Sequence, residues 1–144
     1  MGNRIVVGVD GSSTAQRAFR WAVEEAGFRR AELDLVFVWS ADSHLVDLTE
    51  LPTQQELEAA ALQTVDETLE DAGLPNGDLP VVNPIVTQGS AKEVLLEVAT
   101  GADLLVVGSR GMGGVKGLLL GSVSLHCVTH ADCPVVVVHG TESA

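Results

Sequence analysis

The chain has 144 residues, of which 46% are hydrophobic, and its 20 acidic and eight basic residues give it a formal net charge of −12. This length suits one domain with a single core, residues 1–144, and this hydrophobic content excludes a disordered chain. The negative charge argues against nucleic acid or an anionic membrane as a partner, because either would require a basic face.

The apolar residues exclude two further classes of protein. No apolar run approaches the roughly 20 residues that a membrane-spanning helix needs. The amino-terminal residues lead directly into a strand-like run, without the charged and then apolar stretch of an export signal. We therefore expect a cytoplasmic protein.

In the first half of the chain, strand-like and helical stretches alternate. Residues 4–9 form a continuous apolar run after Arg4, as expected of a central parallel strand buried on both faces. Ser13 and Gln16 fit a capping box that opens a helix, and Gly27 is a plausible end for it. The next predicted elements are a strand over 32–39, a mixed polar connection over 40–52 and a helix over 53–72.

The same alternation continues in the second half, after turn residues at 73–78. The remaining predicted elements are a strand over 81–86, a helix that ends at Gly101, a strand over 103–107, a helix from about Ser122 to His130 and a strand over 134–139. Pro84 indicates that the third strand lies at an edge of the sheet. Ser90 and Glu93 fit a second capping box.

This order of elements predicts an α/β fold, a three-layer doubly wound sandwich around an open parallel sheet. In such sheets ligands bind beyond the carboxyl ends of the strands, where the strand order reverses. The loops Asp10–Ser13 and Gly108–Ser122 both follow strands at that end. If the first and fourth strands are neighbours, the two loops face each other across one crevice.

The second of these loops has the composition of a phosphate-binding segment. Six of the 15 glycines lie between Gly108 and Gly121, and no Asp or Glu occurs from Leu104 to Ala131, where the charged residues are Arg110 and Lys116. A glycine-rich loop between a strand and a helix lets main-chain N–H groups approach an anion, and the helix dipole favours it there. The loop therefore predicts a phosphate cradle.

Three other nucleotide-binding loops are excluded by their spacing. A P-loop needs Gly-Lys followed by Ser or Thr, whereas Gly117 follows Lys116 here. The residues after the first strand match neither a dinucleotide fingerprint nor the Ser-Gly-Gly-x-Asp-Ser loop of pyrophosphatase-type synthetases. Asp10 itself has two open roles: it bonds a ribose hydroxyl or a bound Mg²⁺, or it caps the first helix.

The cysteines and histidines near the carboxyl terminus invite comparison with a metal site. His126, Cys127, His130 and Cys133 form the pattern His-Cys-x-x-His-x-x-Cys. In a helix, however, Cys127 points about 100° away from His126, and Cys133 directly precedes Pro134. We therefore expect no metal bound by side chains here, and a Cys127 that packs in the core.

The motifs together resemble those of the universal stress protein family, in its ATP-binding branch. Gly108-x2-Gly111-x9-Gly121-Ser122 is the glycine pattern of that branch, and a branch without nucleotide should lack it. The resemblance covers essentially the whole chain, including the opening Val7-Gly-Val-Asp-Gly-Ser12 and the closing Cys133-Pro-Val-Val-Val-Val138.

The resemblance implies a Rossmann-like sheet of five parallel strands in the order 3-2-1-4-5, similar to adenine-nucleotide alpha-hydrolases, with ATP at the carboxyl ends of strands one and four. It implies that Asp10 lies near the ribose, that the main chain of Val38 meets the adenine, and that Mg²⁺ or Mn²⁺ binds through the phosphates. It also implies a homodimer through Val135–Val138. The residues that it places at the nucleotide are Gly8, Val9, Asp10, Val38, Val107, Gly108, Arg110, Gly111, Gly121, Ser122, Val123 and Ser124.

No set of nucleophile, base and orienting group is apparent in the sequence, and we assign no catalytic residue. The favoured function is an ATP-binding, nucleotide-responsive stress or signalling module, in which ATP alters segment 40–52, the dimer or a partner surface. The alternative is a slow ATPase or a nucleotide-dependent transferase that acts with a partner.

Overall fold

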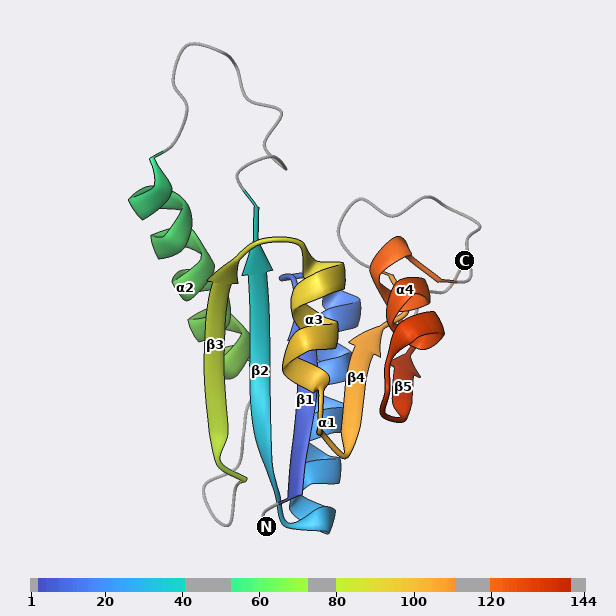
Figure 1. The fold of residues 1–144 in the computed structure, drawn as a ribbon. Helices are drawn as coiled ribbons and strands as arrows, with labels where there is room; N and C mark the ends of the chain where they lie inside the picture. The colour runs from blue at the N-terminus through green and yellow to red at the C-terminus, as the bar shows by residue number, and fades with distance from the viewer. Residues whose placement is uncertain (1–2, 41–52, 73–79, 111–119, 141–144) are drawn as a thin grey trace.

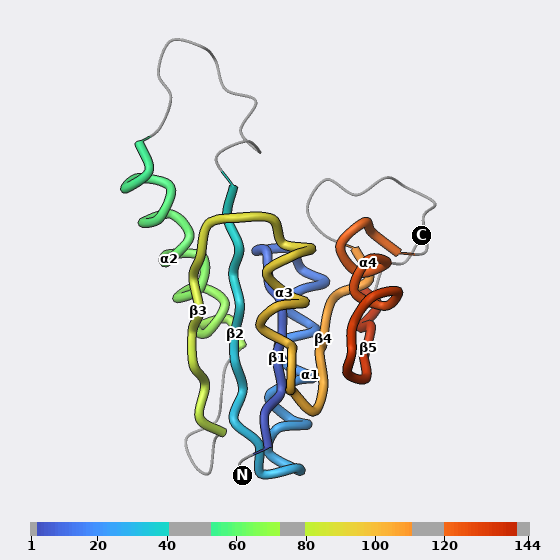
Figure 2. Tube along the Cα trace, viewed as in Figure 1, coloured from blue at the N-terminus to red at the C-terminus, as the bar shows by residue number. Residues whose placement is uncertain are grey.

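The computed structural model describes residues 3–40, 53–72, 80–110 and 120–140 (Figures 1 and 2). Within them the strands are β1 (Asn3–Val9), β2 (Ala31–Trp39), β3 (Val82–Gln88), β4 (Leu104–Gly108) and β5 (Val135–Val138). The helices are α1 (Ser13–Arg29), α2 (Gln54–Asp71), α3 (Ala91–Ala99) and α4 (Ser122–His130). The predicted loop over 41–52, the turn over 73–78 and Gly111 lie outside the described residues.

The strands form one sheet in the order β3-β2-β1-β4-β5, and every neighbouring pair is parallel. This confirms the predicted α/β fold and strand order. β1 is central because Ile5, Val6 and Val7 are fully buried, which leaves no polar face along this strand. β3 lies at an edge, as Pro84 predicted, since proline cannot donate to a second neighbour.

Helices cover both faces of the sheet and make two separate cores (Figure 1). On one face α1 and α2 pack against alternate strand residues such as Ile5, and Phe19 of α1 is fully buried there. On the other face α3 and α4 pack around Val6, Leu105 and other residues of opposite parity. The alternation along each strand therefore divides the chain into three layers.

Two predicted ends of α1 are wrong by one or more residues. Ser12, not Ser13, is the N-cap, and its Oγ accepts a hydrogen bond from the N–H of Ala15 at 3.1 Å. The helix also continues past Gly27 to Arg29 and ends at Arg30, whose φ of 54° is left-handed. Because the N–H of Arg30 bonds back to Ala26 and Gly27, a non-glycine residue occupies the usual glycine position.

The caps of the other helices also differ from the sequence prediction. Thr53 and Glu56 form a reciprocal capping box at the start of α2, which the sequence analysis did not predict. Ser90 is the N-cap of α3, but its side chain makes no capping hydrogen bond, so the predicted box with Glu93 is absent. Sequence spacing located these helices but did not decide how they are capped.

An ion pair lies at the amino-terminal edge of the sheet. Nη1 of Arg4 lies 3.0 Å from Oδ2 of Asp34 and donates at 2.8 Å to the carbonyl of Val98. The amide of Asn83 donates to the other carboxylate oxygen of Asp34 at 3.2 Å. These contacts join β1, β2, β3 and the end of α3, so a charged cluster is satisfied where the hydrophobic core ends. Among the helices that the structure describes, none is long and apolar enough to span a membrane.

Candidate functional site

The carboxyl edge of the sheet brings together the two loops that the sequence singled out. β1 and β4 are direct neighbours, with Ile5 opposite Leu104 and Val7 opposite Val106. The chain leaves β1 toward the α1–α2 face, whereas α3, the helix before β4, lies on the other face (Figure 1). The reversal of strand order therefore lies between β1 and β4, as a ligand crevice in such a sheet requires.

Asp10 shapes the turn after β1. Its Oδ1 accepts the main-chain N–H of Ser12 at 2.9 Å, and Ser12 in turn caps α1. Gly11 between them has a φ of 87°, which glycine adopts without strain. Asp10 is half-buried directly after the central strand, and its carboxylate orders the loop at the carboxyl edge of the sheet.

Four predicted site residues have packed side-chain positions. Val9 and Val107 are buried in the two cores. A Cβ at Gly8 would lie 2.9 Å from both terminal methyl carbons of Leu95 in α3. A Cβ at Gly108 would lie 2.9 Å from Cγ2 of Thr14 and 3.2 Å from its carbonyl carbon.

These contacts change the reason for glycine at position 108. The glycine motif suggested a position against a ligand, whereas the missing side chain of Gly108 leaves room for the first turn of α1. The close approach at this position is between helix and strand. Glycine spacing alone does not reveal which neighbour requires glycine here.

Hydrogen bonds join the start of α4 to the residue that follows β4. The N–H of Gly121 donates to the carbonyl of Ser109 at 2.6 Å. Oγ of the buried Ser124 bridges the same carbonyl, at 3.0 Å, and that of Gly121, at 3.1 Å. Ser124 therefore holds the two ends of the glycine-rich segment together through its side chain, while its N–H remains in the first turn of α4.

Gly121, not Ser122, is the N-cap of α4, and it provides no side-chain cap. The exposed Ser122 is the first helical residue, which confirms the predicted start of this helix. The N–H groups of Ser122, Val123 and Ser124 have no acceptor within the helix, because they belong to its first turn. Val123 packs its side chain against the α3–α4 core. The helix thus begins with three donors that have no acceptor within the helix itself.

The helix starts differ between the two faces of the sheet. α1 and α2 are capped by side chains, of Ser12 and Thr53, whereas α3 and α4 begin without a side-chain cap. Both uncapped starts lie at the carboxyl edge, side by side (Figure 1). An uncapped helix start is partly positive, so this half of the edge favours an anion.

The remaining predicted residues lie around the same edge. Val38 is half-buried near the end of β2, one residue before Trp39, whose carbonyl accepts the N–H of Gly89 at 2.9 Å. Arg110 is half-buried two residues beyond β4. Lys92 in the first turn of α3 is a further half-buried cation near this edge, and no sequence motif pointed to it. Its place on the margin of a helix stripe was the signal that could have found it.

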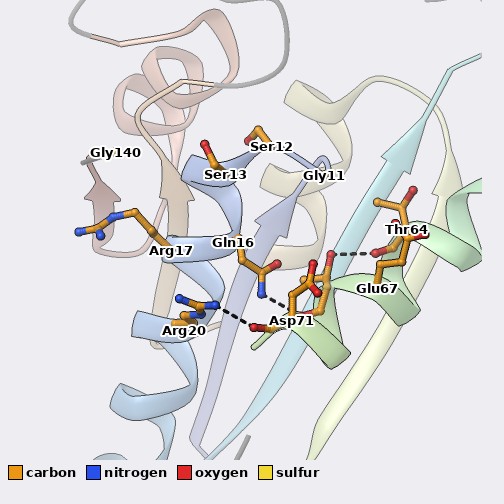
Figure 3. A pocket seen from close by; sticks show the side chains of 11 residues that line it. Gly11, Ser12, Ser13, Gln16, Arg17, Arg20, Thr64, Glu67, Asp71 and Gly140 are labelled. Atoms are coloured by element: carbon orange, nitrogen blue, oxygen red, sulfur yellow. Dashed lines mark hydrogen bonds between the residues drawn. The ribbon is translucent and has the colours of Figure 1, made fainter. Parts of the chain in front are cut away.

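A hollow of about 620 Å³ lies elsewhere, between α1 and α2 (Figure 3). Arg17 and Arg20 of α1 and Glu67 and Asp71 of α2 line it, together with the loop residues 11–13 and Gly140. Nη2 of Arg20 donates to the carbonyl of Asp71 at 2.8 Å, and Gln16 donates to that of Thr68 at 2.9 Å. Its charges of both signs make it less suited to a polyanion than the edge of the sheet.

The cysteine and histidine pattern forms no metal-binding group. Within the described part of the chain, no three His, Cys, Asp or Glu side chains are placed to hold an ion. Cys127 is buried as expected, and burial raises the pKa of its thiol to about 11. His126 and His130 share a helix face, with ring centres 4.5 Å apart.

Comparison with known proteins identifies the family. The model of the universal stress protein family matches residues 1–139. A universal stress protein of Mycobacterium tuberculosis strain H37Rv is 35% identical over an alignment of 144 positions, which covers 96% of this chain but 48% of that protein. One from Thermus aquaticus is 34% identical over 136 residues, 93% of this chain and 96% of its own.

Solved structures agree with the sequence relatives. The universal stress protein UspA from Lactobacillus plantarum superposes with a TM-score of 0.79 at 25% identity, covering 94% of this chain and 97% of its own. A universal stress protein in complex with cAMP has a TM-score of 0.67 at 26% identity, with 96% and 97% covered. The chain spans about half the length of the first curated relatives that it matches. Its sheet order, its glycine motif and these matches show that the chain belongs to the universal stress protein family.

Proposed function

We propose that this protein binds ATP at the carboxyl edge of its sheet and acts as a nucleotide-responsive stress or signalling module. The observation that carries the proposal is the pair of uncapped helix starts, of α3 and α4, on the same half of that edge. A triphosphate is the kind of ligand whose charge such starts favour. Residues 104–131 contain no carboxylate to repel it, although the whole chain is strongly acidic.

In this proposal each part of the edge meets one part of the nucleotide. The N–H groups of Ser122, Val123 and Ser124 bind phosphate oxygens, and Arg110 adds a positive charge. The carboxylate of Asp10 accepts a hydrogen bond from a ribose hydroxyl, a donor that suits an acceptor-only carboxylate. The main chain near Val38 borders the adenine. A family member in complex with cAMP supports an adenine nucleotide as the class of ligand.

A divalent cation fits this site only as a partner of the phosphates. The described residues offer no group of three side-chain ligands, and Asp10 is a single carboxylate. Mg²⁺ commonly binds through substrate phosphates, one or two carboxylates and water. We therefore propose that Mg²⁺ or Mn²⁺ arrives with ATP.

The proposal extends to the place and form of the protein. We propose that it acts in the cytoplasm, where ATP is available, and that residues 1–144 form one universal stress protein domain. β5 lies at the edge of the sheet with four half-buried valines, which supports a homodimer through Val135–Val138.

Calorimetric titration of the full chain with Mg-ATP tests the proposal. We expect saturable binding to one site per chain, and intact ATP when the mixture is analysed by chromatography afterwards. Gly121→Val should abolish binding, because a branched side chain at the start of α4 would fill the approach to its N–H groups. Gly27→Val is the matched control, since a Cβ there meets nothing within 4 Å. Equal affinity of the wild type and Gly121→Val would refute the site.

A further inference from the structure

We infer that Lys92, which lies outside the glycine motif of the family, binds the phosphate chain of the nucleotide together with the start of α4. The inference rests on the proposed ATP binding and adds a residue from α3 to that site. It begins from the burial of the positive charges.

Three cationic side chains belong to half-buried residues in the described part of the chain, namely Arg4, Lys92 and Arg110, whereas Arg17, Arg20, Arg29 and Arg30 are exposed. Arg4 lies at the amino-terminal edge and is paired with Asp34. The ion pairs found among the described residues include neither Lys92 nor Arg110. Partial burial of a lysine or arginine residue covers mainly its hydrocarbon stem, so each charged group is held near the surface without an acidic partner among the described residues, and an anion from outside the chain would be stabilising at both.

Helical spacing fixes the level of Lys92 relative to the sheet. Leu95 and Ala99 form the buried face of α3, and Lys92 lies three and seven residues before them, on the margin of that face. Leu95 lies against Gly8 of β1. From there Lys92 is about 4.5 Å further toward the carboxyl edge, at a rise of 1.5 Å per residue. Asp10 is about 6.6 Å further in the same direction, at a strand rise of about 3.3 Å per residue. The two residues therefore lie at nearly the same level.

The first turn of a helix is an unfavourable position for a lysine. The positive end of the helix dipole repels the ammonium group, and Ser90 provides no side-chain acceptor for the N–H groups beside it. Both effects add positive potential at the start of α3, where Glu93, which is exposed, is the acidic residue of the first turn. A phosphate bound between the starts of α3 and α4, which pack side by side, would compensate it (Figure 1).

Two variants that lose the same charge separate the contact between Lys92 and phosphate from the effect of the chain's overall charge. Lys92→Gln and Arg30→Gln each remove one positive charge, but Arg30 ends α1 at the opposite edge of the sheet. We expect Lys92→Gln to weaken ATP binding about 10-fold, the loss typical of one charge-assisted hydrogen bond. Arg30→Gln and the charge-preserving Lys92→Arg should bind ATP within about threefold of wild type. Adenosine, which has no phosphate, should bind wild type and Lys92→Gln equally.

The outcomes separate this inference from the function on which it rests. If wild type binds ATP and Lys92→Gln binds it equally well, the role of Lys92 is refuted and ATP binding stands. If Lys92→Gln weakens ATP and adenosine alike, Lys92 acts through packing and the phosphate contact is refuted. If wild type binds neither ligand, the proposed function itself fails. Thermal melting of each variant without nucleotide establishes that the fold is retained.

Discussion

Asp10 acts on its own loop and, in our proposal, on the ligand. Asp10→Asn separates the two, because asparagine keeps an oxygen for the N–H of Ser12 and loses the negative charge. We expect the melting temperature without nucleotide to be nearly unchanged and ATP binding to weaken by about 1–2 kcal/mol, as the hydrogen bond to the ribose loses its charge. Calorimetry measures the affinity. A variant that melts much earlier but binds ATP as well as wild type would contradict this division of roles.

Two glycines should respond in opposite directions to alanine. At Gly108 a Cβ would press on Thr14 and on the main chain of α1, so Gly108→Ala should destabilise the fold by about 1–3 kcal/mol. At Gly27, in the last turns of α1, a Cβ has open space, so Gly27→Ala should stabilise it by about 0.5–1 kcal/mol. Denaturant unfolding measures both changes.

Thr14→Ser provides the control for the Gly108 variant. It removes Cγ2, the nearest atom to the new methyl group, but leaves the main-chain contacts with Thr14 and Ala15. The double variant should therefore recover part of the loss. If Gly108→Ala were as stable as wild type, the close packing of α1 on β4 would be wrong.

At the scale of single residues the sequence predicted the positions of Asp10, Gly108 and Ser124 near the carboxyl edge of the sheet better than it predicted their contacts. The contact of Asp10 with Ser12 is local. Ser124, however, bonds Ser109, and Gly108 packs against Thr14, 94 residues away in the chain. Local spacing cannot contain such contacts.

The helix starts give a comparison at the scale of elements. Thr53→Ala removes the side-chain cap of α2 and should cost about 1 kcal/mol of unfolding free energy. Ser90→Ala should cost much less, because the hydroxyl of Ser90 makes no capping bond at the start of α3. Chemical denaturation of the two variants measures this difference. Equal losses would indicate that α3 is capped by its serine after all, and would remove one support for an anion site there.

Sequence patterns located every strand and helix of the described chain, because hydrophobic periodicity is strong in a doubly buried sheet. These patterns did not predict the first and last residues of α1 correctly. Ser12 and Ser13 are equally good caps by composition, and Arg30 adopts a left-handed conformation that its type does not predict. Which serine caps α1, and where the helix ends, depend on how α1 packs on the sheet, which is a tertiary contact.

The proposed dimer can be tested at the edge of β5. Pro134 and Val138 turn their carbonyl groups to β4, so by alternation the main chain of Val137 faces away from it. Val137→Pro removes an N–H that faces away from β4 and that a second chain paired at this edge would use. We expect a monomer by light scattering, with the far-ultraviolet spectrum retained, if wild type is a dimer through this strand. A dimer that persists in the variant would rule out pairing at this edge.

For the whole molecule, the fold and the family followed from the sequence, and the arrangement of charge did not. The parallel sheet was predicted from the alternation of elements and the order of its strands from the family resemblance, and the structure confirms both. The contrast between capped helices on one face and uncapped helices on the other is visible only once α3 and α4 are side by side. The proposed role of Lys92 in binding phosphate depends on this difference between the two faces of the sheet.

A crystal structure of the chain with Mg-ATP tests the central claim most directly. The account predicts phosphate oxygens within hydrogen-bonding distance of the N–H groups of Ser122 and Val123, with the ribose beside Asp10. It would be contradicted by a nucleotide bound in the hollow between Arg20 and Glu67, or by an edge of the sheet without ATP under saturating conditions.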